Sequence, residues 1–219
     1  MLYFNQERFV EAEPLFLRAF SISQQALGPE HPHVASCLNY LAGLYHVLAR
    51  YTEAETLFLR ALSIRETALG PEHPDVATSL NNVALLYSDL DDFSKSEPLF
   101  LRALNIYEKV LSPQHPSVAT ILNNLALLYY SQQMFAQAES LFQRALNINE
   151  QALGLDHPQM AIAWQNYALL LRAAERYEEA TEFEAWAQAV WNKRAQKTPK
   201  PRMLLGNTLQ VYEPVFLQR

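Results

Sequence analysis

The sequence predicts an all-α fold, a right-handed α-solenoid built from helix-turn-helix hairpins. The first observation behind it is a repeat, because the dipeptide His-Pro begins at residues 31, 73, 115 and 157, each 42 residues after the last. The second is that apolar residues recur at three- and four-residue steps within each interval, which is the period of an amphipathic helix. One hairpin cannot bury both of its faces alone, so neighbouring hairpins are expected to stack.

The 42-residue period also sets the predicted domain boundaries. These are a half repeat at 1–30, repeats at 31–72, 73–114 and 115–156, a divergent repeat or cap at 157–198, and a C-terminal tail at 199–219. The half repeat holds a second helix over about residues 9–26 but only a stub, Met1 to Phe4, of the first helix that would cover it. We expect the chain to be a fragment of a longer array, or a second copy or the tail to cover that face.

Each repeat is expected to contain two helices and a link. The proline of His-Pro falls in the first turn of the first helix, where its missing N–H is no loss. A short polar turn, Ser88–Asp92 in one repeat, leads to the second helix, which a glycine then ends. That glycine is Gly28, Gly70 or Gly154, and Ser112 takes its place in the remaining repeat.

Small and large side chains alternate at fixed positions of the repeat. Alanines recur where close helix approach demands them: Ala42, Ala84, Ala126 and Ala168 in the first helix, and Ala61, Ala103, Ala145 and Ala187 in the second. Tyr45 and Phe58, with their equivalents, are expected to fill the space between the helices.

The order Leu-Ala-x-x-Tyr, followed by Ala, Phe and Ala on the next helix, resembles the tetratricopeptide repeat. The phrase Leu-Gly-Pro-Glu-His-Pro-Asp-Val-Ala-Thr at residues 69–78, followed by Leu-Asn-Asn, is similar to the kinesin light chain subgroup of that family. The resemblance covers residues 1 to about 190. It implies a scaffold that binds proteins or peptides, but the coiled coil through which such light chains join a motor heavy chain has no counterpart here.

The sequence departs from the repeat pattern at two places. Ser96 replaces the alanine of a second helix, and Glu184 stands where Phe142 predicts an aromatic residue. We therefore expect the last hairpin to pack differently, with Phe183, Trp186 and Trp191 compensating.

Composition excludes several kinds of chemistry. The five glycines are too widely spaced for a phosphate-binding glycine-rich loop. The one cysteine, Cys37, allows neither an internal disulfide nor a multi-cysteine zinc site, and we expect a buried, inert thiol. Histidines of successive hairpins would lie about 10 Å or more apart, too far to share one zinc ion. We predict no enzyme activity, no metal and no cofactor.

Charge and hydropathy limit the classes of partner that the chain can bind. The formal charge is −6, and basic residues gather from residue 193 onward. The repeats themselves are therefore acidic, which disfavours binding to nucleic acid. Charged residues interrupt every apolar stretch before the roughly 20 residues that span a bilayer, and no signal peptide is evident. We predict a cytoplasmic protein that binds neither nucleic acid nor membrane.

Two sets of charged residues recur in the second helices. They are Arg18, Arg60, Arg102 and Arg144, and Glu13, Glu55, Glu97 and Glu139. We predict that they form surface salt bridges with each other, in preference to a binding strip for acidic ligands.

The face of the first helices opposite the buried stripe is the candidate binding surface. In a curved stack this face lines the concave side and predicts a peptide-binding groove. The groove residues are Asn39, Tyr40, Thr78, Asn81, Asn82, Leu85, Thr120, Asn123, Asn124, Leu127 and Asn166. An Asn side chain both donates and accepts hydrogen bonds, so a row of them can pair with the backbone of an extended peptide. The alternative is a solvated polar face without a ligand.

The predicted groove is neutral. No Lys or Arg occupies its positions, whereas the matching groove of kinesin light chains uses basic residues to attract acidic peptides. We therefore predict a scaffold for protein–protein interaction that binds neutral, extended peptide segments. The alternative function is a structural or oligomerisation module of a larger signalling protein, with a possible homodimer through the half repeat or the tail. The apolar tail is predicted to cap the last hairpin, to occupy the groove, or to dock on a neighbour.

Overall fold

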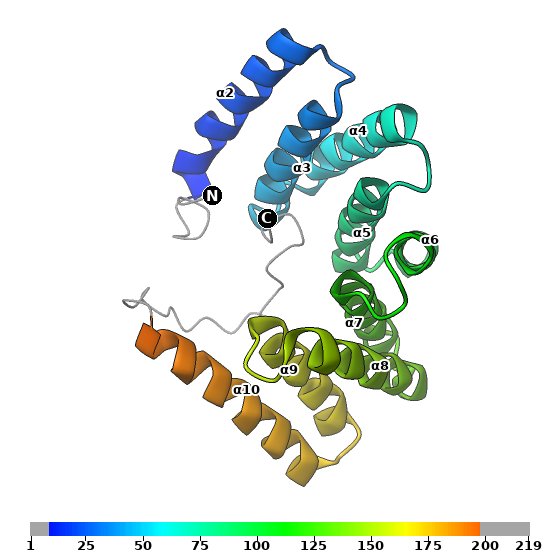
Figure 1. Cartoon of the computed structure of the whole chain (residues 1–219), viewed down its shortest axis with the longest axis vertical. Helices are drawn as coiled ribbons and strands as arrows, with labels where there is room; N and C mark the ends of the chain where they lie inside the picture. Colours follow the sequence, from blue (N-terminus) through cyan, green and yellow to red (C-terminus); the bar gives the residue numbers. More distant parts are fainter. Residues whose placement is uncertain (1–8, 198–219) are drawn as a thin grey trace. The chain divides into compact units, whose positions relative to one another are not determined.

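The structure, a computed structural model, describes the backbone of residues 9–197 and the side chains of residues 12–195. Within them the chain forms only helices and turns (Figure 1). The helices are α2 (Phe9–Leu27), α3 (Pro32–Val47), α4 (Tyr51–Leu69), α5 (Pro74–Asp89), α6 (Phe93–Val110), α7 (Pro116–Ser131), α8 (Phe135–Leu153), α9 (Pro158–Ala173) and α10 (Tyr177–Lys197). The predicted stub Met1 to Phe4 and the tail at 199–219 lie outside the described residues.

The described helices belong to two compact units, residues 9–106 and residues 107–197. In the first unit α3 packs on α4, and both α2 and α5 pack against that hairpin. In the second unit α7 packs on α8 and α9 on α10, and α8 and α9 join the two hairpins. Within each unit the predicted all-α fold of helix-turn-helix repeats is confirmed. No helix in the described part of the chain is long and apolar enough to cross a membrane.

A histidine caps the first helix of every repeat. The Nδ1 atom of the residue before proline accepts a hydrogen bond from the backbone N–H two residues later, at 3.1 or 3.2 Å. These capping residues are His31, His73, His115 and His157. The cap satisfies an N–H that has no partner inside the helix, and the proline at the next position removes another. The recurrent His-Pro dipeptide therefore marks a helix start.

The turn inside each hairpin also repeats. After the first helix, the backbone N–H of Arg50 donates to the Tyr45 carbonyl at 2.8 Å, and the N–H of Ala49 donates to the His46 carbonyl at 2.9 Å. These two hydrogen bonds together form the Schellman motif, which requires a residue in the left-handed conformation. The left-handed residues are Ala49, Asp91, Gln133 and Glu175, with φ of 56° to 62°. The chain thus reverses direction after every first helix in the same way.

The links between repeats use a different left-handed conformation. Gly28, Gly70 and Gly154 have φ of 85°, 87° and 79°, and Ser112, at the equivalent place, has φ of 128°. For Gly70 and Gly154 ψ is 155° and 166°, a region that is essentially reserved for glycine. The predicted equivalence of Ser112 with the glycines is therefore confirmed, and this serine carries the strain that the glycines avoid.

The core of each repeat forms where its two helices meet. Ala61 and Ile64 of α4 pack with Val34, Ala35 and Leu38 of α3. The eight repeated alanines are at most 1% exposed, as predicted for positions of close helix approach. Phe58, Phe100 and Phe142 are fully buried fillers. Ser96 is also buried, and its hydroxyl donates to the Ala84 carbonyl at 2.7 Å, which satisfies the polar atom that the exchange from alanine introduced.

The last hairpin packs differently, as expected. The Glu184 carboxylate turns away from the aromatic position and accepts two hydrogen bonds from Arg172, at 2.6 and 2.7 Å. Phe183 fills the space instead, with its ring edge-on to Tyr167 at 5.0 Å and to Trp186 at 4.9 Å between centroids. A one-residue shift of the aromatic side chain thus preserves the core.

Replacing Ser112 with glycine is expected to raise the free energy of unfolding by about 1 kcal/mol. A non-glycine residue in such a conformation costs about 1–3 kcal/mol. Glycine offsets part of that gain, since it loses about 0.5–1 kcal/mol more backbone entropy on folding. Urea unfolding measures the difference. The reverse exchange, Gly154→Ser, is the matched control and is expected to destabilise. A Ser112→Gly protein no more stable than the wild type would show that Ser112 is unstrained.

Candidate peptide-binding cleft

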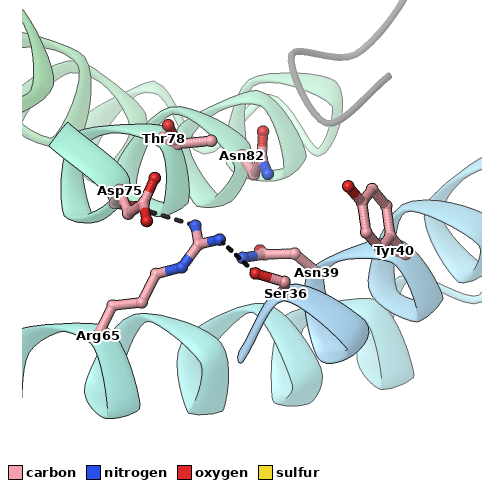
Figure 2. A pocket seen from close by; sticks show the side chains of 7 residues that line it. All are labelled: Ser36, Asn39, Tyr40, Arg65, Asp75, Thr78 and Asn82. Carbon is pink, nitrogen blue, oxygen red and sulfur yellow. Dashed lines mark hydrogen bonds between the residues drawn. The ribbon is translucent and has the colours of Figure 1, made fainter. Parts of the chain in front are cut away.

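A cleft in the first unit collects side chains from three helices (Figure 2). We call it the α3–α5 cleft. It is lined by Ser36, Asn39 and Tyr40 of α3, Arg65 of α4, and Asp75, Thr78 and Asn82 of α5. Four of these residues, Asn39, Tyr40, Thr78 and Asn82, are predicted groove residues, and every lining side chain carries a polar group. The structure therefore brings part of the predicted groove together in one polar cleft.

Arg65 ties the three helices of the cleft together. Its side chain is only 6% exposed. One terminal nitrogen donates to the Asp75 carbonyl oxygen and to the Ser79 hydroxyl, both at 2.9 Å, and the other donates to the Ser36 hydroxyl at 3.2 Å. A buried guanidinium needs several acceptors to offset the loss of hydration. Its hydrogen bonds from α4 to α3 and α5 therefore hold the floor of the cleft in place.

Two buried amides face the cleft from α3 and α5. Asn39 and Asn82 are each 2% exposed. Asn39 Nδ2 donates to the Ser79 hydroxyl at 3.2 Å, and Asn82 Oδ1 accepts from Asn81 Nδ2 at 3.5 Å. Within the described residues, the other two amide atoms, Asn39 Oδ1 and Asn82 Nδ2, have no hydrogen-bond partner. An acceptor and a donor are thus left open at the same cleft.

The predicted groove residues of the second unit are arranged differently. Asn166 Nδ2 donates to Asn123 Oδ1 at 3.2 Å, so these two amides satisfy each other. Asn124 is 2% exposed, and Leu127 is partly buried against the core of this unit. The Thr120 hydroxyl donates to the Pro116 carbonyl of its own helix at 3.2 Å. The hydrogen bond between Asn166 and Asn123 therefore distinguishes the second unit from the first.

The remaining predicted residues of the first unit differ in their exposure. Tyr40 stacks on Phe16 of α2, with ring centroids 6.1 Å apart. Asn81 is fully buried, and Leu85 is partly buried. The Thr78 hydroxyl donates to the Pro74 carbonyl at 3.2 Å, as Thr120 does in its helix. The side chain of Asn81 contacts Asn82 and is not accessible to a ligand.

The neutral character predicted for the groove needs a correction in the α3–α5 cleft. No Lys or Arg stands at the predicted positions, but the guanidinium of Arg65 reaches the cleft from a second helix. Asp75 contributes a carboxylate to the same cleft, so the two formal charges balance. Sequence reasoning missed both residues because it considered one face of the first helices. The available signal was the repeat itself, since Ser23, Tyr107 and Asn149 occupy the Arg65 position elsewhere.

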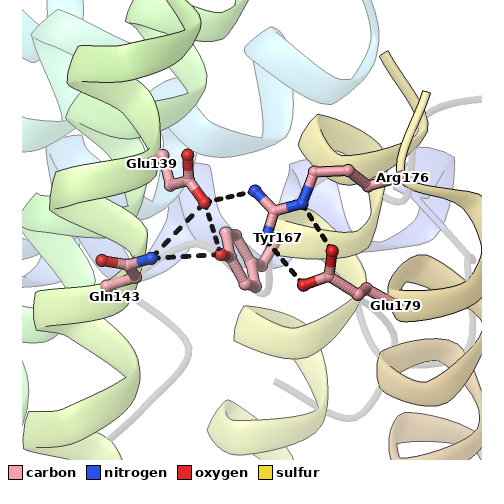
Figure 3. Close-up of polar contacts among 5 residues, drawn as sticks. All are labelled: Glu139, Gln143, Tyr167, Arg176 and Glu179. Atoms are coloured by element: carbon pink, nitrogen blue, oxygen red, sulfur yellow. Dashed lines mark hydrogen bonds and ion pairs between the residues drawn. The ribbon is translucent and has the colours of Figure 1, made fainter. Parts of the chain in front are cut away.

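The repeated glutamates make a second kind of polar cluster (Figure 3). Glu139 of α8 accepts hydrogen bonds from the Tyr167 hydroxyl at 2.9 Å and from Arg176 at 2.5 Å, and Arg176 also binds Glu179. The hydrogen bond from Arg176 lowers the pKa of Glu139 below its ordinary value. Burial raises the pKa of Tyr167. The cluster therefore stabilises an ionised glutamate and a neutral tyrosine.

The first unit contains the same type of cluster. The Tyr45 hydroxyl and Arg50 both donate to Glu13 at 3.0 Å. The Tyr87 hydroxyl donates to Glu55 at 2.7 Å, and burial together with that contact raises the pKa of Tyr87 to about 12. In each case a tyrosine of a first helix meets a glutamate of the preceding second helix. The repeated glutamates thus join consecutive repeats within a unit.

The predicted pairing of repeated arginines with these glutamates is wrong where the partners are seen. Arg102 pairs with Glu66 at 2.6 Å, and Arg144 pairs with Glu108 at 2.5 Å. Each partner lies 36 residues earlier, on the preceding second helix. Glu139, which the sequence had paired with Arg144, instead accepts hydrogen bonds from Tyr167 and Arg176. The arginines still form partly exposed ion pairs, which contribute little each.

The contacts of Cys37 and of the capping histidines stabilise the fold. Cys37 is buried, and its sulfur lies 3.5 Å from the Ser23 hydroxyl. Among the residues that the structure describes, no three His, Cys, Asp or Glu side chains lie together in a way that could hold a metal ion. The Nδ1 atoms of the four capping histidines accept hydrogen bonds from the helix backbone, so the geometry assigns these residues a role in folding.

The repeats and their packing define the class of protein, an α-helical repeat scaffold. A family model described as tetratricopeptide repeat matches residues 1–49, 38–109, 82–151 and 117–193. The chain belongs to the tetratricopeptide repeat family, whose members generally mediate protein–protein interaction. No curated protein sequence matches the chain.

Several solved structures share the fold of this chain. BtubC (BKLC) from P. vanneervenii is 25% identical with a TM-score of 0.72, over 96% of this chain and 84% of that one. A putative kinesin light chain of Podosopora anserina, with nearly identical TPR-like repeats, is 24% identical with a TM-score of 0.68, over 90% and 92%. The apo form of RapI, 17% identical with a TM-score of 0.62 over 89% and 81%, shares the fold. The family model thus confirms the predicted tetratricopeptide repeat, and the putative kinesin light chain shares its fold.

The Glu139 cluster predicts a specific pH dependence of stability. Because the pKa of Glu139 is lower in the folded protein, its contribution is fully present above the ordinary carboxyl pKa and is lost as the pH falls through the folded value. We expect Glu139→Gln to cost about 1 kcal/mol at pH 7 and the cost to disappear towards pH 3. Urea unfolding at several pH values measures this.

Glu182→Gln is the control, since Glu182 is exposed on α10 and its loss is expected to change stability by no more than about 0.5 kcal/mol. If the cost of Glu139→Gln stayed constant from pH 7 to pH 3, the ionised carboxylate would not be the stabilising form.

Proposed function

We propose that this chain is a non-catalytic protein-binding module that holds an extended peptide segment in the α3–α5 cleft. The observation that carries the proposal is the set of polar side chains that three helices bring to this cleft. Four predicted groove residues are among them, and two present an open hydrogen-bonding atom. A peptide backbone offers one N–H and one C=O per residue, the groups that such a surface pairs with.

The charges of the cleft favour a neutral segment. Arg65 and Asp75 contribute one charge of each sign, so a ligand with net charge of either sign gains attraction from one residue and repulsion from the other. We place this interaction in the cytoplasm, a reducing compartment that is compatible with the free, buried thiol of Cys37.

A peptide-display screen followed by fluorescence anisotropy tests the proposal. We expect uncharged peptides to be selected and Asn82→Ala to weaken their binding about tenfold, which corresponds to the loss of one hydrogen bond to a buried amide. Asn149→Ala is the control, because Asn149 is also a buried asparagine but lies on α8, outside this cleft. Selection of no peptide, or equal affinity for the wild type and Asn82→Ala, would contradict the proposal.

A second candidate function, self-association, is favoured by the exposed face of α2. Ile22 is 56% exposed, whereas its equivalents Ile64, Ile106 and Ile148 are 0–2% exposed. The face comprises Leu15, Ala19, Ile22 and Ala26, all exposed. Their spacing of four, three and four residues matches the seam of a two-helix coiled coil. We propose that α2 of a second copy covers this face, since the same seam on both copies makes a two-fold symmetric contact.

Ile22→Glu tests the second candidate by sedimentation. The substitution is expected to turn a concentration-dependent dimer into a monomer, because it places a charge in the apolar seam. Leu17→Glu is the matched control, since Leu17 is 43% exposed, like its equivalents Leu59 and Leu101 at 42% and 44%. A wild type that is monomeric at all concentrations would refute self-association. If removal of residues 199–219 made such a monomer dimerise, the tail would be the cover of this face.

A further inference from the structure

One pair of equivalent atoms is bonded in the second unit and open in the first. Asn123 and Asn166 lie two repeats after Asn39 and Asn82, respectively, at the same places in the repeat. Asn166 Nδ2 donates to Asn123 Oδ1 at 3.2 Å. The corresponding atoms, Asn82 Nδ2 and Asn39 Oδ1, are the two buried amide atoms of the α3–α5 cleft that lack a partner within the described residues.

The two units differ in the residues that contact the first asparagine of each pair. Ser79 is fully buried, and its hydroxyl receives hydrogen bonds from Arg65 at 2.9 Å and from Asn39 at 3.2 Å. At the places equivalent to Ser79 and Arg65, the second unit has Ala163 and Asn149. An alanine offers no acceptor to the asparagine in front of it. Ser79, fixed by Arg65, therefore engages Asn39 in a way that the second unit cannot reproduce.

We infer that Ser79 and Arg65 keep the α3–α5 cleft open for an amide group of the ligand, whose oxygen accepts from Asn82 Nδ2 and whose N–H donates to Asn39 Oδ1. The inference rests on the proposed function and deepens it, since it names the group that is bound and where. Ser79 and Arg65 are positioning residues, because they act through Asn39. Figure 2 shows Asn39 and Asn82 on facing helices, with the guanidinium of Arg65 next to Asn39 and hydrogen-bonded to Asp75 and Ser36.

The two unpaired atoms, one acceptor and one donor, favour an amide over a charged group. A carboxylate only accepts hydrogen bonds and would leave Asn39 Oδ1 opposite another acceptor. An ammonium only donates and would leave Asn82 Nδ2 opposite another donor. An amide supplies one acceptor, its oxygen, and one donor, its N–H, on the two sides of one carbonyl carbon. A buried polar atom without a partner costs about 1–3 kcal/mol, so a group that satisfies both atoms at once gains from each.

The experiment compares the wild type with Ser79→Ala, which reproduces Ala163 of the second unit. The probe is a fluorescein-labelled, uncharged peptide selected by display against the wild type. Without the Ser79 hydroxyl, Asn39 is expected to accept from Asn82 and to close the cleft, so that affinity falls at least tenfold. The melting temperature is expected to fall only slightly, because the new hydrogen bond between Asn82 and Asn39 replaces one of the two that the Ser79 hydroxyl accepts, and Arg65 keeps its hydrogen bond to the Asp75 carbonyl. Ser94→Ala, an exposed serine on α6, is the control.

A second probe reads the amide directly and does not depend on the variant. Replacing the backbone amides of the peptide one at a time by esters removes single N–H donors, and replacing its Asn or Gln residues by Ala removes side-chain amides. One ester is expected to weaken binding to the wild type about tenfold and to have no effect on Ser79→Ala. If only an Asn or Gln replacement does so, the bound amide belongs to a side chain.

The outcomes separate this inference from the proposed function. If the wild type binds the peptide and Ser79→Ala binds it equally well, the inference is overturned while peptide binding stands. The same conclusion follows if neither the ester series nor the Ala series weakens binding. If the wild type binds no peptide, the proposed function fails, and the inference fails with it.

Discussion

The close approach of the two helices in each repeat is the constraint on which the rest of the chain depends. Alanine at the contact lets Val34, Ala35 and Leu38 of α3 reach Ala61 and Ile64 of α4, and the second unit repeats the arrangement with Met160, Ala161 and Trp164 around Ala187. When the helices are this close, the first helix is covered on most sides, and its asparagines become buried amides. On α2, by contrast, Leu15 and Ile22 are exposed. Packing thus decides both where polar groups are buried and where an apolar face is left.

Much of the fold could be predicted from the sequence because the relevant information is local. The His-Pro dipeptide marks helix starts, since the imidazole caps the helix and the proline needs no hydrogen-bond acceptor. Ser112 follows from the repeat, because three glycines at the equivalent position show which backbone conformation is needed there. The different packing of the last hairpin could also be predicted, because Phe183 is an aromatic residue directly before Glu184, which stands at the aromatic position of the repeat. All of these features depend on neighbours along the chain.

The candidate site could be predicted only in part because it depends on contacts between helices. The helical period places Asn82 on the predicted groove face and Asn39 beside that face, but it does not reveal that Arg65, a long side chain of another helix, reaches the same cleft. The sequence also pairs the repeated arginines with the wrong glutamates. The partner of each charged side chain depends on how neighbouring helices pack, and the helical period does not reveal this. The useful signal was departure from the repeat. Arg65 and Ser79 stand where the other copies have different residues, and they distinguish an open cleft from a closed one.

The central claim is that the open amides of the first unit, and not the bonded amides of the second, bind the ligand. Two-dimensional NMR of the side-chain NH2 groups, in protein labelled with nitrogen-15 and titrated with the display-selected peptide, tests it most directly. The account predicts a large, saturable shift of the Asn82 NH2 signals and little change at Asn166, whose NH2 group already donates to Asn123. Equal shifts at both residues, or a shift at Asn166 alone, would contradict it.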